Sequence, residues 1–192
     1  MPMSGRTDHD ARVTGLALAA ARGDRRALET FIRETQRDVW RFVAHLGHAN
    51  TADDVTQETY LRAITALPRF AGNSTARTWL LSIARRVCAD EVRRAMARPR
   101  ITRGVDWIDI ADNQQAATRP SRWEDVVEAN LLLDALPAER REALVLTQVL
   151  GLSYQEAAAV TGCPIGTVRS RVARARESLI EASEATRFRH SG

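Results

Sequence analysis

The chain has 192 residues, a hydrophobic content of 44% and a formal net charge of +4 at pH 7. That length suffices for one medium or two small domains, and the positive charge permits a nucleic-acid partner without establishing one. No apolar run approaches the length of a signal-peptide core or a membrane span, so we expect a soluble, cytoplasmic protein without membrane insertion.

The residue types favour helices and a reducing compartment. Aromatic residues make up 5% of the chain, and all 28 basic residues are arginine. Few aromatic residues and many alanines favour helices over sheets. The two cysteines, Cys88 and Cys163, lie far apart and outside any CxxC pair. We therefore expect two buried thiols rather than a disulfide or a metal site.

The first half of the chain is predicted to form a compact bundle. Apolar side chains recur at helical spacing over residues 11–23, 25–46, 51–67 and 76–97. Residues 1–10 are polar and are expected to be frayed, whereas Asn50 or Thr51 is expected to cap the third helix. The fourth helix is expected to direct a set of apolar residues inward, namely Leu80, Ile83, Ala84, Val87, Cys88 and Val92. Four such helices suit a domain of about 85 residues.

A linker and a second helical domain are expected to follow. Residues 100–120 lack sustained periodicity, which is typical of a linker. Its apolar residues Trp107, Ile108 and Ile110 are expected to hold the two domains together in the free protein and to mask DNA-binding surfaces. Ser121 and Glu124 predict a capping box that opens a helix through Asp134. The next helix is expected to run from Pro137 to Gly151, with Leu144, Val145 and Val149 facing inward.

The last predicted unit is a helix-turn-helix. Ser153 and Glu156 form a capping box, Gly162 breaks the short helix, and Pro164 opens the next one. The second helix carries one apolar stripe made of Ile165, Val168, Val172, Ala175 and Leu179. Its other side presents short residues and arginines: Gly166, Thr167, Arg169, Ser170, Arg171, Ala173, Arg174 and Arg176.

Two interpretations of this second helix compete. One is a solvated helix rim with a charge run. The other is a recognition helix, because short side chains let the backbone approach a DNA major groove and Arg, Ser and Thr bind base edges or phosphates. A solvated helix usually mixes both signs of charge, whereas no acid lies between Pro164 and Arg176. The single sign favours DNA binding.

Several segments closely resemble the two conserved domains of extracytoplasmic-function (ECF) RNA polymerase sigma factors. The N-terminal domain is matched by Asp53-Asp-Val-Thr-Gln-Glu-Thr-Tyr-Leu-Arg-Ala63, Arg69-Phe70 and Thr78-Trp-Leu-Leu-Ser-Ile-Ala-Arg85. The C-terminal domain is matched by Leu136-Pro137 with Arg140, Gly151-Leu-Ser-Tyr154, Gly166-Thr-Val-Arg-Ser-Arg171 and Arg174-Ala-Arg176. The resemblance covers nearly the whole chain beyond the first ten residues and the linker, and it is greatest to the SigC-like, actinobacterial type.

The resemblance implies an all-α fold of two small helical domains joined by a flexible linker. Residues 11–98 would be the region 2 domain, 99–120 the linker and 121–186 the region 4 domain with its helix-turn-helix. Such a factor binds core RNA polymerase and directs promoter-specific initiation by recognising the minus-10 and minus-35 elements. The implied partners are the clamp helices of the largest polymerase subunit, the flap of the second-largest subunit and promoter DNA, with an anti-sigma factor as a further candidate. No cofactor is implied.

The resemblance also assigns residues to each interface. Core polymerase would be bound by Asp53, Asp54, Gln57 and Glu58, although the helix dipole alone accounts for the first two. The minus-10 element would be bound by Phe70, Asn73, Ser74, Arg77, Trp79, Arg85, Arg86 and Arg93, with Trp79 equally compatible with the core. The minus-35 element would be bound by Thr167, Arg169, Ser170, Arg171, Arg174 and Arg176; of these, Arg169, Ser170 and Arg174 would read bases.

Two other classes of protein compete with this interpretation. A stand-alone helix-turn-helix regulator would use the N-terminal bundle as a sensor or dimerisation module, and binding to core polymerase separates it from a sigma factor. An enzyme is the other class, with His45 and His48 as a metal pair or Asp53 and Asp54 as a carboxylate pair. Neither pair has a third ligand or a nucleophile motif beside it, so we expect no metal and no catalytic activity.

Overall fold

The computed structural model describes residues 3–97 and 132–190, with side chains for all of these except 3–5, 47–49 and 184–190. Within both ranges every regular element is helical. The first range contains α1 (Met3–Ala21), α2 (Arg25–Val43), the π-helical turn η1 (Ala44–His48), the 3-10 turn η2 (Ala49–Thr51), α3 (Ala52–Ala66), the 3-10 turn η3 (Leu67–Arg69) and α4 (Ala76–Ala97). The second contains α6 (Ala138–Leu144), the π-helical turn η4 (Val145–Val149), α7 (Tyr154–Thr161) and α8 (Ile165–His190).

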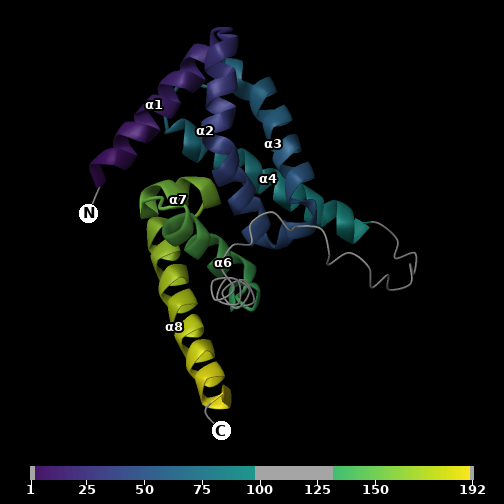
Figure 1. Ribbon diagram of the computed structural model, residues 1–192, viewed down its shortest axis with the longest axis vertical. Helices are drawn as coiled ribbons and strands as arrows, with labels where there is room; N and C mark the ends of the chain where they lie inside the picture. Colours follow the sequence, from purple (N-terminus) through teal and green to yellow (C-terminus); the bar gives the residue numbers. More distant parts are fainter. Residues whose placement is uncertain (1–2, 98–131, 191–192) are drawn as a thin grey trace.

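Helices α1 to α4 form the bundle that the apolar periodicity predicts (Figure 1). Asp24 begins α2, because its carboxylate accepts a hydrogen bond from the Ala27 amide at 3.0 Å. Thr51 stands at the N-cap of α3, but its side chain makes no capping hydrogen bond. The bundle core consists mainly of Phe31, Val39, Phe42, Leu80, Leu81 and Val87. Burying each such side chain stabilises the fold by about 1.5–3 kcal/mol, which makes this core the main support of the helices.

The helix-turn-helix forms as expected. The Ser153 hydroxyl accepts from the Glu156 amide at 3.2 Å while Glu156 Oε2 accepts from the Ser153 amide at 2.8 Å, which completes the capping box. Gly162 ends α7 with φ of 70°, a left-handed conformation that favours glycine. Val168 and Val172 of α8 are fully buried. The capping box, the glycine turn and the buried valines together fix α7 and α8 relative to each other.

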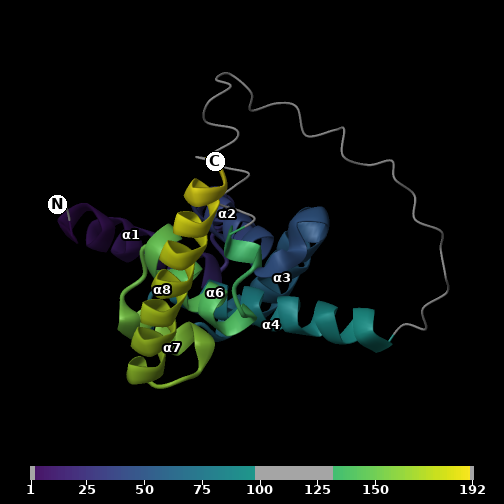
Figure 2. The ribbon, with the colours of Figure 1, turned by 90° about the horizontal axis from the view of Figure 1, so that it is seen from below.

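The helix-turn-helix unit packs directly on the bundle. Helix α4 contacts α7, and the turn η1 contacts α6. The buried apolar side chains of both units form one continuous cluster. Figures 1 and 2 show α6 and α7 beside α4, with α8 running away from the bundle. The predicted linker, including Trp107, Ile108 and Ile110, lies outside the described part of the chain, and so do residues 121–131 of the helix that was predicted to run through Asp134.

The prediction of a frayed N-terminus was wrong. Helix α1 already begins at Met3. The Arg6 guanidinium donates to the Gly151 carbonyl, and α1 packs against α4. Both contacts involve elements that lie far away in the sequence. The polar composition of this segment therefore did not predict its structure.

Some apolar residues that were predicted to face inward are exposed. Helix α2 ends at Val43 rather than at Leu46, because the chain continues as a π-helical turn. The second π turn moves Val149 outward to 39% exposure and buries Leu150, whose amide donates to the Val145 carbonyl five residues earlier. Val92 is exposed because the last turns of α4 extend past the bundle (Figure 2), and Ile165 is exposed at the very start of α8.

Candidate protein and nucleic-acid interfaces

The four residues expected to bind a basic protein partner lie on α3, at Asp53, Asp54, Gln57 and Glu58. The first three are exposed and Glu58 is half-buried. The two aspartates occupy the first turn, where the helix dipole favours negative charge. Asp53 Oδ1 accepts a hydrogen bond at 2.9 Å from the indole Nε1 of Trp40 on α2. A neighbouring helix therefore holds Asp53, whereas the Asp54 carboxylate points to solvent.

Sequence reasoning missed the apolar part of this face. Leu61 is 57% exposed, Ile64 is 41% exposed and Trp40 is 40% exposed. Leu61 follows Gln57 by four residues and Ile64 follows Leu61 by three, which sets them on one side of α3. This spacing could have identified Leu61 and Ile64 as part of the same face as the polar residues. Apolar side chains that are exposed together on one face, with polar residues around them, mark a candidate protein-binding surface.

A chain of four charges joins α3 to α4. Glu58 Oε1 accepts from Arg62 Nε at 2.7 Å, and Arg62 Nη1 donates to Asp90 Oδ2 at 2.5 Å. Asp90 Oδ1 in turn accepts from Arg93. Arg62 and then Arg93 hold the pKa of Asp90 below its usual value. Glu58 and Arg93, which were predicted for two different interfaces, therefore share one charge network.

The loop between η3 and α4 has an aromatic support and an exposed polar tip. The rings of Phe70 and Trp79 lie 4.9 Å apart between centroids with a tilt of 41°, and Phe70 is buried. Asn73 and Ser74 are exposed. Thr75 begins α4, because its hydroxyl accepts from the Thr78 amide at 3.2 Å. The two rings thus pack on each other beneath the loop.

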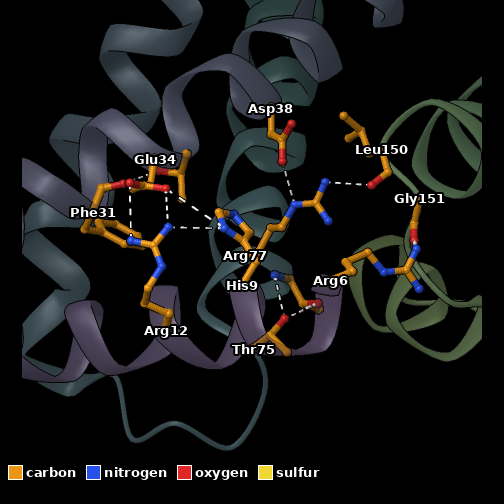
Figure 3. Close-up of polar contacts among 12 residues, drawn as sticks. Arg6, His9, Arg12, Phe31, Glu34, Asp38, Thr75, Arg77, Leu150 and Gly151 are labelled. Atoms are coloured by element: carbon orange, nitrogen blue, oxygen red, sulfur yellow. Dashed lines mark hydrogen bonds and ion pairs between the residues drawn. The ribbon is translucent and has the colours of Figure 1, made fainter. Parts of the chain in front are cut away.

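Two of the predicted DNA-binding arginines contact the helix-turn-helix unit. Arg77 is only 8% exposed; its Nε donates to Asp38 at 2.6 Å and its Nη2 donates to the Leu150 carbonyl at 2.6 Å (Figure 3). Arg85 Nε donates to Glu142 Oε1 at 2.6 Å. Arg77 and Arg6 donate to the carbonyls of Leu150 and Gly151, respectively, just beyond the end of η4. Carbonyl groups at the end of a helix lack intrahelical hydrogen-bond donors. Arg86, by contrast, is exposed.

Burial at the contact between the two units perturbs several titratable groups. It raises the pKa of Glu142 in spite of the opposing effect of Arg85, and it raises the pKa of Asp10 in spite of Arg77. Asp10 Oδ1 is buried and has no hydrogen-bond partner. Burial, with a smaller effect of the nearby Glu142, raises the pKa of the Cys88 thiol to about 12. Burial therefore disfavours the ionised form of the Glu142 and Asp10 carboxyl groups.

Some of the predicted minus-35 residues of α8 contact other side chains, whereas others are exposed. The guanidinium of Arg169 lies 5.8 Å from the ring centroid of Tyr154, a cation–π contact. Arg176 donates to Gln148 at 2.6 Å, and Arg171 Nη1 lies 3.7 Å from Cys163 Sγ. Ser170 and Arg174 are exposed, while Thr167 is half-buried. The helix thus shows a polar, positively charged ridge above its buried valines.

Other site types find little support among the described residues. Within residues 3–97 and 132–190 no three His, Cys, Asp or Glu residues gather as a metal site would require. Burial lowers the pKa of His45, which opposes its protonation. Cys88 is a buried free thiol and Cys163 is a half-buried one. In the same part of the chain, no helix has the length and apolar character needed to cross a membrane.

Comparisons with known proteins identify both helical units. Residues 31–98 match the family "Sigma-70 region 2", and residues 128–179 match "Sigma-70, region 4". The ECF RNA polymerase sigma factor SigC of Mycobacterium tuberculosis is 54% identical over 182 residues, which cover 95% of this chain and 97% of that protein.

Two solved structures are similar over most of the fold. One is CnrH in complex with the cytosolic domain of CnrY, with a TM-score of 0.70 and 26% identity over 91% of this chain and 98% of that one. The other is the sigma factor RpoE in complex with the anti-sigma factor NepR from Bartonella quintana, with a TM-score of 0.67 and 27% identity over 82% and 96%. The chain belongs to the ECF RNA polymerase sigma factors, which direct transcription from specific promoters.

Proposed function

We propose that residues 11–98 bind core polymerase and the minus-10 element, that residues 99–120 link the domains, and that residues 121–186 bind the minus-35 element. The two family matches fall within the first and third ranges. The presence of a helical bundle and a separate helix-turn-helix unit supports a division into two domains, although α1 begins before residue 11, at Met3. In this assignment the protein supplies specificity and has no catalytic activity of its own. It acts in the cytoplasm, where RNA polymerase is found.

The outward face of α3 docks on the clamp helices of the largest polymerase subunit in this proposal. The observation that carries it is the combination of exposed acid and exposed leucine on one helix face, at Asp54 and Leu61. Acids complement a basic partner and steer its approach, while apolar side chains supply the desolvated contact. Trp40 and Ile64 extend this face on either side.

Reversing the charge of Asp54 tests the docking face. Asp54→Arg should lower the affinity for purified core polymerase at least tenfold, because like charges then oppose each other across the contact. Glu29→Arg is the matched control, since Glu29 is an exposed acid on α2 outside the proposed face. Binding is measured by fluorescence anisotropy of labelled protein, with circular dichroism to check folding. Holoenzyme formation by Asp54→Arg at the wild-type affinity would remove this assignment.

The minus-10 interface combines the loop tip and one side of α4. Asn73 and Ser74 are exposed and offer hydrogen bonds to an unstacked base, while Arg86 offers positive charge to the separated strand. Phe70 and Trp79 act as the support beneath the loop, since each ring already packs on the other. Arg77 and Arg85 join this interface only when the helix-turn-helix unit releases them.

The minus-35 interface is the exposed ridge of α8. Arg174 and Ser170 face solvent and are available to base edges, and Arg169 reaches them from above Tyr154. Thr167, Arg171 and Arg176 hold phosphates in this proposal. The flap of the second-largest polymerase subunit would bind the same domain. RpoE was solved with an anti-sigma factor, and we include a protein of that type among the partners of this chain.

A further inference from the structure

The charge network between α3 and α4 contains one arginine that serves two acids. Arg62 lies between Glu58 and Asp90, at 2.7 Å and 2.5 Å, and is 34% exposed at its side chain. Glu58 belongs to the proposed polymerase-binding face, and Asp90 pairs with Arg93 of the proposed minus-10 interface. A guanidinium has enough donors to bind both acids at once, which a lysine does not achieve in the same fixed geometry.

We propose that Arg62 is a shared counter-ion whose position trades affinity for core polymerase against affinity for promoter DNA. This inference rests on the proposed function, because it takes Glu58 to face the polymerase and Arg93 to face the DNA. In this proposal Arg62 is a positioning residue, which acts through Glu58 and Asp90 rather than by contact with either partner. The more it neutralises Glu58, the less Glu58 attracts a basic surface. The more it neutralises Asp90, the freer Arg93 becomes to bind a phosphate.

The network predicts effects of opposite sign at the two interfaces. Without Arg62, Glu58 is unpaired and attracts core polymerase more strongly, while Asp90 is left to neutralise Arg93 alone. Without the Asp90 charge, Arg93 is released to DNA, while Arg62 neutralises Glu58 alone. Ion pairs that are partly exposed have small energies, so each effect should be about 1.5- to 5-fold in affinity. Release of Arg93 should also steepen the salt dependence of DNA binding by about 0.7–0.9 in log–log slope.

Two variants and two matched controls test this trade-off. Arg62→Gln is paired with Arg33→Gln, which removes the same charge from an exposed arginine of α2. Asp90→Asn is paired with Glu91→Gln, because Glu91 forms the equivalent i,i+3 pair with Arg94 at 3.0 Å and has no bond to α3. Affinity for core polymerase is measured by anisotropy without DNA. Affinity for DNA is measured as a function of salt with purified holoenzyme and a promoter fragment selected by in-vitro transcription.

We expect Arg62→Gln to bind core polymerase more tightly and promoter DNA more weakly than Arg33→Gln does. Asp90→Asn should show the reverse pattern relative to Glu91→Gln. Arg62→Lys, which keeps the charge, should fall between Arg62→Gln and the wild type at both interfaces, and this guards against a loss of folding as the cause. Affinities that move in the same direction, or that match the controls, would overturn the inference. Failure of Asp54→Arg to weaken core binding would instead overturn the docking face itself.

Discussion

The pair between Arg85 and Glu142 should respond very differently to the loss of each partner. It joins α4 of the bundle to α6 of the helix-turn-helix unit. The Glu142 carboxylate is the buried member, whereas the Arg85 side chain is 38% exposed. Arg85→Ala leaves a buried carboxylate without its donor as long as the two units stay together. Separation of the units returns that carboxylate to water. The arginine variant should therefore favour an open molecule.

The magnitude follows from the burial of Glu142. A buried acceptor that loses its hydrogen bond is destabilised by about 1–3 kcal/mol, which corresponds to a shift of about 5- to 150-fold toward the open form. Glu142→Gln should shift the equilibrium far less. Burial already raises the pKa of this carboxyl even with Arg85 present, so a neutral side chain is tolerated there. The double variant should recover most of the compaction that Arg85→Ala loses.

Small-angle X-ray scattering of the free, full-length protein measures this opening. The radius of gyration should rise in Arg85→Ala, stay near the wild-type value in Glu142→Gln, and fall back in the double variant. Arg86→Ala is the control, because its arginine is adjacent and exposed. An unchanged radius of gyration in Arg85→Ala, or an equal rise in Glu142→Gln, would refute the reasoning. Two independently moving units in the wild type would refute the closed arrangement altogether.

Three further predictions concern pH, base reading and helix capping. Domain closure should strengthen as the pH falls, because the raised pKa values of Glu142 and Asp10 mean that closure takes up protons. This contribution to the stability of the closed form is fully present below the ordinary pKa of a carboxyl group. It is lost as the pH rises through the raised pKa values. Scattering against pH should show this response weakened in Glu142→Gln and retained in Glu29→Gln, which removes an exposed acid of α2; a flat wild-type profile would contradict it. Arg174→Ala should reduce minus-35 discrimination by about 1–3 kcal/mol in binding assays with substituted promoters, and an unchanged preference would reject base reading by Arg174. Ser153→Ala should lower the free energy of unfolding by about 1 kcal/mol in denaturant titrations, with Ser183→Ala as the control, and equal midpoints would argue against the capping box.

Local signals in the sequence predicted the elements that depend on neighbouring residues. The apolar period of α4 predicted residues 76–97, the bounds that the structure has, and Ser153 with Glu156 predicted the start of α7 within one residue. Each of these elements is determined by side chains within a few turns of one another. For the same reason the buried stripe of α8 was correct from Val168 to Ala175.

Long-range contacts could not be predicted in the same way. The family resemblance assigned Arg77 and Arg85 to the minus-10 interface, yet in this structure they bind groups that lie 73 and 57 residues further along the chain. Near the early start of α1, Arg6 donates to Gly151, which is 145 residues away. Each π turn adds one residue to a helical turn, so a strict α-helical period wrongly placed Val149 on the buried side. No periodicity within one helix contains information of this kind.

The assignment as a sigma factor is best tested by in-vitro transcription with purified core polymerase, this protein and a library of promoter fragments. We expect start sites that appear only when the protein is added, and the promoters that use them should share two elements at a fixed spacing. These start sites should be lost with Asp54→Arg. DNA binding without core binding and without new start sites would rule out a sigma factor and would indicate a stand-alone regulator.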